Sequence, residues 1–354
     1  MRKRRRSNAR VGNDMAEQYA VSVIIPVYST QKYLRECLDS VCQEAYFPRY
    51  EVLLVDDGST DGSAEIMREY ADRHPNVFAL QYGEKPENRG LASARNLGLR
   101  HAHGRYVFFL DSDDAVRDQY IGRLYDRIVQ AECDVAYAGY SRWSGEKVTP
   151  VCRPVLTEEG TMTGREFLGK RMDRRDDHDF VWCALYQRSL FTDFGVAFKD
   201  GVRLYEDLPF TLLAACEAPR VCAVPLYGYL YRQRPGSLVQ DGIRPRDAEG
   251  TMQALEIIFG DPHRYLGDPV CLRYCSQVIS MCLYYVGVLA KEKAVSPAWQ
   301  RQFLRRLRSM IPWRRMYRAA VTPREKVKWW IWRIDPKLFC RIVSRGYRKE
   351  KGTK

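Results

Sequence analysis

Three features that would assign the chain to familiar classes are missing from its sequence. The eleven cysteines are scattered without a CxxC pair, and several lie among apolar residues, where a thiol behaves as a small hydrophobic side chain. This usage favours a reducing cytoplasm over a disulfide framework. The five histidines show no metal-binding spacing, and no run reaches the roughly 18 apolar residues of a membrane-spanning helix. We interpret the longest candidate, residues 278–290, as part of a core helix.

Two kinds of nucleotide-binding motif are also missing. GxGxxG does not follow the first predicted strand, and GxxxxGK[ST] occurs nowhere. The dinucleotide-binding and P-loop interpretations therefore lose their main support. A nucleotide can still bind where a metal ion, rather than a glycine-rich loop, contacts its phosphates.

Acidic residues are scarce at both ends of the chain. The net charge is +13, but residues 301–354 hold 18 Lys/Arg against 3 Asp/Glu and residues 1–10 carry +6, which leaves −8 for residues 11–300. We expect residues 1–19 to form a disordered basic arm without the apolar core of a signal peptide, with Met15 as an alternative start. The basic charge belongs to the ends.

The segment from residue 19 to residue 110 alternates apolar runs with amphipathic helical patterns. The predicted strands are 19–27, 51–55, 77–82 and 106–110, and the predicted helices are 31–42, 63–73 and 88–101. This order predicts an α/β fold with an open, mostly parallel sheet and flanking helices. Such sheets bind ligands beyond the carboxyl ends of their strands. Three strands end there in polar residues: Pro26 and Tyr28, Asp56 and Asp57, and Asp111 and Asp113.

The acidic stretch after the last of these strands is a candidate metal site. Asp111, Asp113 and Asp114 repel one another unless a cation neutralises them. Carboxylates at a strand end suit Mg²⁺ or Mn²⁺, which take one or two of them together with substrate phosphates. The alternative is an acidic turn that begins a helix.

Five segments, in this order, resemble the family 2 glycosyltransferases of GT-A fold. They are VSVIIPVYST (21–30), EVLLVDDGSTDGS (51–63), ENRGLASARNLGLRHAHGRYVFFLDSDD (87–114), LYEDLPF (204–210) and YLYRQRPGSL (229–238). The resemblance implies a Rossmann-like GT-A domain over 20–245, with a nucleotide-sugar half (20–115) and an acceptor half (116–245). A helical, basic, aromatic-rich region is expected over 246–354.

The resemblance also implies which residues bind the donor. Pro26 and Tyr28 would line the base and Asp57 would accept a hydrogen bond from it, with Asn88 and Arg95 reaching the nucleotide. The alternatives are an Asx-turn, assigned mainly to Asp56, and a structural pair between Arg95 and a strand-end aspartate.

The metal and catalytic roles follow from the same resemblance. Asp111 would contact the ribose side and Asp113 the divalent metal, Mn²⁺ or Mg²⁺, while Asp114 would cap a helix. Asp207 would be the general base, with Glu206 orienting it or contacting the acceptor, and a single base implies inversion. Three further residues are candidates for binding: Arg234 and Ser237 at the diphosphate, and Trp182, either as a substrate platform or as a core residue.

The C-terminal region interleaves aromatic residues with cations, as around Trp313 and over residues 329–341. This composition suits a helix on an anionic membrane surface, or an amphipathic helix packed on the catalytic domain. Nucleic acid is not expected as a partner because no nucleic-acid motif accompanies the charge.

The functional expectation is an inverting transferase that moves a sugar from a nucleotide-diphosphate sugar, preferably a UDP-sugar, to a glycan or lipid-linked acceptor. Its expected setting is surface-polysaccharide synthesis in the cytoplasm, peripheral on the inner face of the cell membrane. Two alternatives remain open at this point: another nucleotide-sugar or nucleotidyl-transfer enzyme, and a non-catalytic membrane- or polyanion-binding adaptor.

Overall fold

The computed structural model describes residues 19–43, 49–83, 87–151, 154–157, 159–174, 180–202, 204–234 and 242–342. The chain divides into two compact units. The first comprises the residues up to 201 together with 213–234, and the second comprises 202–212 together with 235–354. Residues 202–212 therefore group with the C-terminal helices rather than with the sheet.

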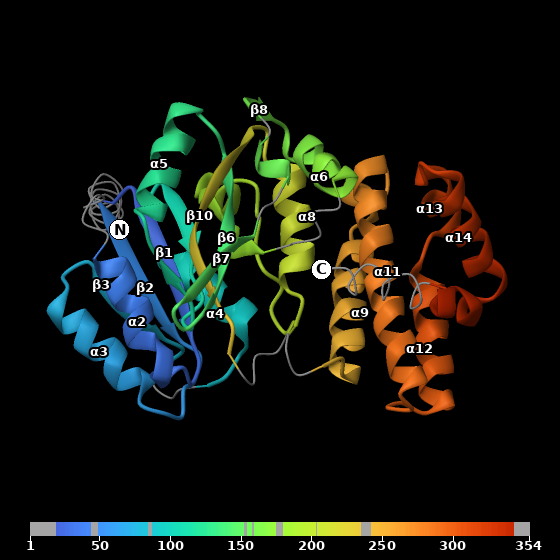
Figure 1. Ribbon diagram of the computed structural model, residues 1–354, viewed down its shortest axis with the longest axis horizontal. Helices are drawn as coiled ribbons and strands as arrows, with labels where there is room; N and C mark the ends of the chain where they lie inside the picture. The colour runs from blue at the N-terminus through green and yellow to red at the C-terminus, as the bar shows by residue number, and fades with distance from the viewer. Residues whose placement is uncertain are drawn as a thin grey trace, which may run out of the picture. The chain divides into compact units, whose positions relative to one another are not determined.

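The N-terminal half of the first unit has the parallel order expected from the sequence. Its strands run in the order β3-β2-β1-β4, with β1 hydrogen-bonded to both β2 and β4. The first three of these strands are labelled in Figure 1. The strands are β1 (Val21–Val27), β2 (Tyr50–Asp56), β3 (Val77–Gln81) and β4 (Tyr106–Phe109). The helices are α2 (Gln31–Cys42), α3 (Ser63–Arg73) and α4 (Leu91–His101). The predicted bounds of α2 and α3 are confirmed.

The rest of the sheet is mixed. Within the described residues the sheet has ten strands. β9 (Ala184–Gln187) is antiparallel to β4 and to β6 (Val135–Ser144), whereas β10 (Val221–Arg232) is parallel to β6. Three short strands complete it by antiparallel pairing: β5 (Ala115–Val116), β7 (Lys147–Val151) and β8 (Thr161–Met162). The helices of this half are α5 (Tyr120–Gln130), α6 (Gly164–Asp173) and α7 (Ser189–Thr192).

Close packing against β1 depends on Gly98 and Gly104. Gly98 of α4 faces Ile24 of β1, and a Cβ at this position would overlap the isoleucine side chain. A Cβ at Gly104 would lie 2.5 Å from the backbone nitrogen of Ser22. The helix and the turn can therefore approach β1 only where a side chain is missing.

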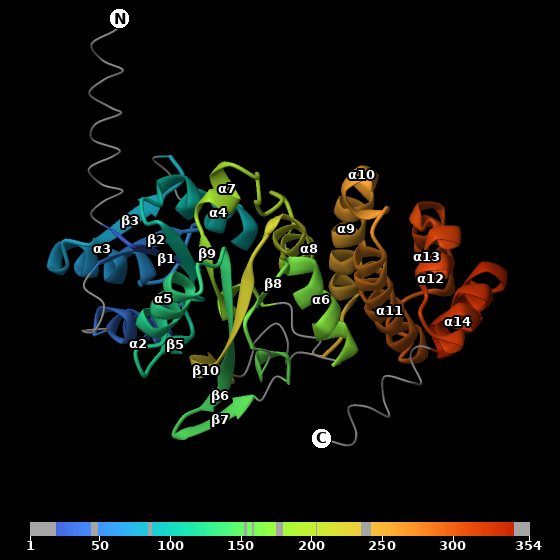
Figure 2. The same cartoon turned by 90° about the horizontal axis from the view of Figure 1, so that it is seen from above.

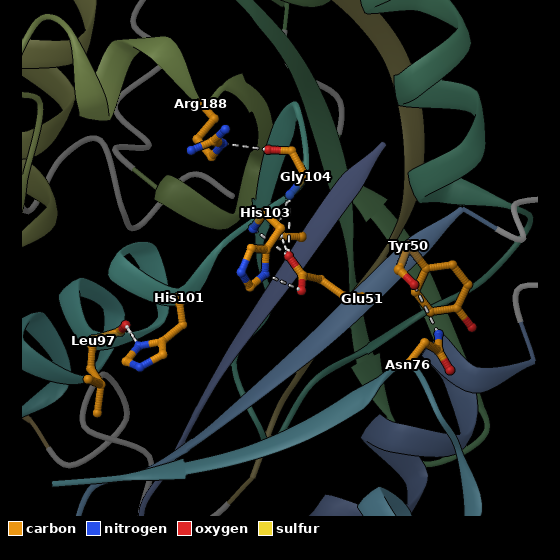
Figure 3. A network of polar contacts seen from close by, with 9 residues as sticks. Tyr50, Glu51, Asn76, Leu97, His101, His103, Gly104 and Arg188 are labelled. Carbon is orange, nitrogen blue, oxygen red and sulfur yellow. Dashed lines mark hydrogen bonds and ion pairs between the residues drawn. The ribbon is translucent and has the colours of Figure 1, made fainter. Parts of the chain in front are cut away.

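A buried polar network fixes the amino edge of the sheet (Figure 3). Glu51 has no exposed surface, and it accepts hydrogen bonds from Ser22 Oγ (2.5 Å), the His103 backbone N–H (2.6 Å) and the Gly104 N–H (3.3 Å). His103 Nδ1 lies 3.1 Å from the other carboxylate oxygen. Every polar atom of the Glu51 carboxylate thus has a partner, as a buried acid requires.

The second unit is helical, as expected for the C-terminal region (Figure 2). Its helices are α9 (Pro245–Gly260), α10 (Pro262–Tyr265), α11 (Pro269–Lys291), α12 (Pro297–Met310), α13 (Trp313–Ala319) and α14 (Pro323–Ile334), and residues 336–342 are also helical. All of these segments except α13 begin with proline, which suits the first helical position because its nitrogen needs no partner there. Within the described residues, no helix is long and apolar enough to cross a bilayer.

Candidate active site

The carboxyl end of β1 presents one exposed aromatic side chain. Pro26 is buried in the strand, whereas the ring of Tyr28 is 50% exposed. The next residue, Ser29, has a left-handed backbone with φ of 50° and is bound through Ser59 and Thr60 to the loop that follows β2. This turn ends the strand and leaves the Tyr28 ring available to a planar ligand.

Asp57 follows β2 and holds the start of the α4 loop. Its carboxylate accepts from the Arg89 N–H (2.8 Å) and from the Gly90 N–H (2.9 Å). Gly90 has a φ of 91°, a conformation that glycine adopts without strain. Burial raises the pKa of Asp57, and the two backbone donors counteract that rise. Asn88 is exposed beside these donors.

Asp56 makes the turn that the sequence analysis assigned to it. Its Oδ1 accepts from the Ser59 N–H at 2.9 Å, three residues ahead. The neighbouring aspartates therefore differ in their contacts: Asp56 binds its own loop, whereas Asp57 binds a loop more than thirty residues later.

Arg95 is paired with Asp111, as the structural alternative in the sequence analysis proposed. Its Nη2 lies 2.9 Å from Asp111 Oδ1, and only 2% of the arginine side chain is exposed, against 25% of the aspartate. The guanidinium carbon lies over the Phe198 ring, 5.3 Å from the ring centroid. Arg95 therefore orients Asp111 from inside the unit, and Asp111 is the partner that reaches the surface.

Asp113 is paired with Arg234. Arg234 Nε lies 2.7 Å from Asp113 Oδ2, and both side chains are about one-quarter exposed (29% and 26%). Arg232 donates from Nε to the Asp113 backbone carbonyl at 2.7 Å. Two arginines at the end of β10 thus neutralise and position the acidic turn after β4.

The expectation that Asp114 caps a helix is wrong, because β5 follows it instead. Asp114 is 1% exposed and accepts from the Tyr229 hydroxyl (2.7 Å) and from the Arg232 N–H (2.8 Å). Burial, followed by the charges of Asp113 and Asp111, raises its pKa well above the usual value. Asp114 joins the acidic turn to β10.

A divalent metal fits the carboxylates of this turn. No cluster of three or more histidine, cysteine or acidic residues is found in the part of the chain that the structure describes. Mg²⁺ and Mn²⁺ at phosphate sites need fewer protein ligands, because one or two carboxylates, water and the phosphates complete the shell. Asp113 and Asp111 supply such a pair, both partly exposed, while Asp114 is committed to β10.

Trp182 lies inside an aromatic cluster. Its ring is 4% exposed and stacks on Tyr229 at 4.2 Å and on Phe180 at 4.4 Å between ring centroids. These contacts are those of a core residue rather than of an exposed substrate platform.

Glu206 and Asp207 belong to the second unit. Asp207 is the first residue of α8 (Asp207–Glu217), and Glu206 before it is 7% exposed. The preceding residue, Tyr205, has a φ of 63°, and its hydroxyl lies 3.1 Å from Asp247 Oδ1 and 3.0 Å from the Tyr285 hydroxyl. The acidic pair therefore opens an apolar helix, as its sequence predicts. Ser237 lies outside the described residues.

The sequence analysis missed the residues that surround Arg232. Its guanidinium lies 3.8 Å from the Trp143 ring centroid and 5.0 Å from that of Tyr33, and it pairs with Glu36 at 2.6 Å. Arg232 at the end of β10, followed by Arg234, was the available signal, but the aromatic partners of Arg232 lie about ninety and two hundred residues earlier.

Comparison with known proteins identifies the first unit. The model of the family described as Glycosyl transferase family 2 matches residues 22–195. EpsJ of Bacillus subtilis, an uncharacterized glycosyltransferase, is 28% identical over 304 residues, which span 85% of this chain and 86% of EpsJ. The glycosyltransferase GlyG of Streptococcus pneumoniae is 30% identical over 62% of this chain and 73% of GlyG. The minor teichoic acid biosynthesis protein GgaA of B. subtilis is 30% identical over 60% of this chain and 47% of GgaA.

A solved structure has the same fold. Residues 1–349 of S. aureus TarS, crystallised with UDP-GlcNAc, superpose with a TM-score of 0.69 and 22% sequence identity over 93% of this chain and 92% of that chain. The GT-A type expected for the sheet and the helical C-terminal region are thus both confirmed. The family match and these relatives agree, and the chain belongs to glycosyl transferase family 2.

Proposed function

We propose that this glycosyltransferase moves a sugar from a UDP-sugar to a hydroxyl group of a glycan or lipid-linked acceptor, with inversion at the anomeric carbon. The observation that carries the proposal is the order of the strand ends. β1 lies between β2 and β4, so Tyr28 is flanked by Asp57 on one side and by Asp111 and Asp113 on the other. A base-binding group on one side of a strand end and a diphosphate-binding group on the other suit a nucleoside diphosphate.

Tyr28 and Asp57 would bind the base. The half-exposed ring of Tyr28 offers a stacking face, and the Asp57 carboxylate keeps lone pairs beyond those used by Arg89 and Gly90. A carboxylate accepts the imide N–H of uracil, a donor that cytosine lacks. The UDP-GlcNAc complex of TarS, a protein of the same fold, supports uridine as the base. Pro26 would support the ring from within the strand, and Asn88 would contact the nucleotide.

Asp113 would hold Mn²⁺ or Mg²⁺, with Asp111 on the ribose side. The metal would neutralise the diphosphate as it leaves. Arg234 would contribute a second positive charge once the diphosphate draws it away from Asp113. Ser237, three residues further on, would bind the same group. Arg95 would keep Asp111 in place.

Asp207 would take the proton from the acceptor hydroxyl during its attack, and Glu206 would orient it. The first turn of a helix stabilises negative charge, which suits a carboxylate that acts as a base. No second carboxylate is assigned as a nucleophile, so the reaction would be a single displacement.

The acceptor is proposed to belong to a surface polysaccharide, with the enzyme acting peripherally at the cytoplasmic face of the membrane. The relative GgaA, named for minor teichoic acid biosynthesis, supports this setting. Membership of family 2 disfavours the adaptor alternative. A nucleotidyl-transfer enzyme would not need the Glu206-Asp207 helix start.

The test is a thermal-shift and transfer assay on matched variants. UDP with Mn²⁺ should stabilise the wild-type protein more than GDP does, and Asp113→Ala should lose the metal-dependent part of this stabilisation. Asp207→Asn should bind UDP normally but transfer no sugar. Asp72→Asn, on an exposed face of α3, controls for the loss of one carboxylate. Transfer by Asp207→Asn at the wild-type rate would contradict the assigned base.

A further inference from the structure

Exposed apolar side chains gather at one place in the second unit. Nine large apolar residues are exposed within the described part of the chain, and six of them fall between residues 321 and 342. Those six are Val321 (66%), Val327 (57%), Trp330 (47%), Ile334 (71%), Leu338 (43%) and Ile342 (36%). Single exposed apolar residues are ordinary, but a concentration of this kind marks an interaction surface.

The spacing of these residues gives each helix an exposed apolar face. Val327, Trp330 and Ile334 are three and four residues apart in α14, so they share one side of the helix. Leu338 and Ile342 have the same relation in the helical residues 336–342. We call these five residues the α14 apolar face.

The opposite side of the same helices already forms a core. Trp329 and Trp332 are 2% and 1% exposed, and their rings lie 6.0 and 5.7 Å from that of Phe339. Packing of the second unit therefore uses the buried tryptophans, and it leaves the α14 apolar face open within this unit.

Positive charge surrounds this face. Residues 321–342 contain six cations and two acids, a net charge of +4. Both acids are used locally: Glu325 accepts from the backbone N–H groups of Val321 (2.8 Å) and Thr322 (3.1 Å), and Asp335 accepts from those of Lys337 and Leu338. The cations are Arg324, Lys326, Lys328, Arg333, Lys337 and Arg341.

We infer that the α14 apolar face and its surrounding cations dock on an anionic lipid surface. Helices with an apolar side and flanking lysines and arginines lie in the membrane interface, where the apolar side enters the acyl boundary and the cations contact headgroups. A second copy of the chain fits less well, because a two-fold contact would bring two +4 surfaces together. Nucleic acid would leave the apolar residues exposed. The inference rests on the peripheral membrane setting proposed above and names the residues of its contact surface, whereas lipid binding does not depend on the transfer reaction.

The experiment uses the full chain and sedimentation with vesicles, without any nucleotide sugar. Vesicles of phosphatidylcholine are compared with an equal mixture of phosphatidylcholine and phosphatidylglycerol, at low and high salt. The wild-type protein should bind the anionic vesicles, and salt should weaken binding. Trp330→Ser with Ile334→Asn should weaken it at least tenfold, and Lys326→Gln should weaken it by about fivefold at low salt, since each cation near the surface contributes about 1 kcal/mol.

The matched control removes two exposed apolar residues of the first unit, Val129 (43%) and Phe194 (46%), by substitution with serine. This variant should bind vesicles as the wild-type protein does, and all variants should unfold at the wild-type temperature. Equal binding of the wild-type protein to neutral and anionic vesicles would overturn the inference. So would a lipid-independent dimer, seen by light scattering, that the Trp330/Ile334 variant abolishes, because the occupant would then be a second copy. The vesicle-binding and light-scattering results do not depend on whether the protein transfers a sugar.

Discussion

Replacing Arg234 by methionine should have opposite effects on two ligands of one site. The Arg234 guanidinium lies 2.7 Å from the Asp113 carboxylate, where a divalent metal would also bind. A metal ion at that oxygen therefore competes with the arginine for its negative charge. When UDP is present, the guanidinium gains a phosphate partner, so the same residue competes with the metal alone and assists the nucleotide.

The magnitudes follow from the exposure of the pair. With the side chains 29% and 26% exposed, the ion pair contributes about 1 kcal/mol, so Arg234→Met should bind Mn²⁺ alone about fivefold more tightly. A hydrogen bond from a guanidinium to phosphate is worth about 1.5–3 kcal/mol, so UDP in the presence of Mn²⁺ should bind roughly 10- to 100-fold more weakly.

Titration calorimetry with Mn²⁺, and then with UDP in the presence of Mn²⁺, measures both effects. Arg35→Met is the control, because Arg35 also forms an ion pair, with Glu69 at 2.5 Å, but between α2 and α3. It should change neither affinity. Unchanged or weaker binding of Mn²⁺ to Arg234→Met, in a protein that unfolds at the wild-type temperature, would refute the competition.

Three further predictions concern stability and the base. Burial, then the hydrogen bond to Asp39, raises the pKa of Tyr70 from 10.0 to about 12. The hydroxyl therefore contributes stability below pH 10, and this contribution is lost as the pH rises through about 12. Urea unfolding should show that the stability of Tyr70→Phe falls less over this pH range than that of the wild-type protein. Gly104→Ala should lower the free energy of unfolding by about 1–3 kcal/mol because its Cβ meets the β1 backbone, whereas Gly260→Ala, which meets nothing, should not; equal stability of the two would contradict the close approach. Tyr28→Ala should weaken UDP binding in calorimetry by about 1–3 kcal/mol without lowering the unfolding temperature, since the lost ring is half exposed; unchanged affinity would remove Tyr28 from the base site.

The parallel half of the fold was readable because its signals are local. The helices α2 and α3 begin and end where the sequence predicts, and the polar residues after β1, β2 and β4 stand at strand ends. The pairing in the mixed half of the sheet was not predicted: β9 lies antiparallel to β4 and β6, which precede it by tens of residues. No periodicity within a strand specifies its neighbour.

The same distinction separates the correct and incorrect interpretations of the site. Asp56 was assigned to a turn correctly, because its donor is three residues away. Asp114 was misassigned, because its partners Tyr229 and Arg232 are 115 and 118 residues away. For Arg95, the choice between nucleotide and aspartate depended on burial, which a motif does not contain.

The hydrogen bonds of Asp57 have a consequence for how base preference can change. The carboxylate that would contact the base also anchors the Arg89–Gly90 loop, so its replacement would release the start of α4 as well as the nucleotide. A substitution of Asp57 that altered base preference would therefore also lower the stability of the protein. Exposed Asn88, beside the anchored amides, is free of that constraint. We expect a laboratory selection for a new donor base to change Asn88 first and to leave Asp57 in place.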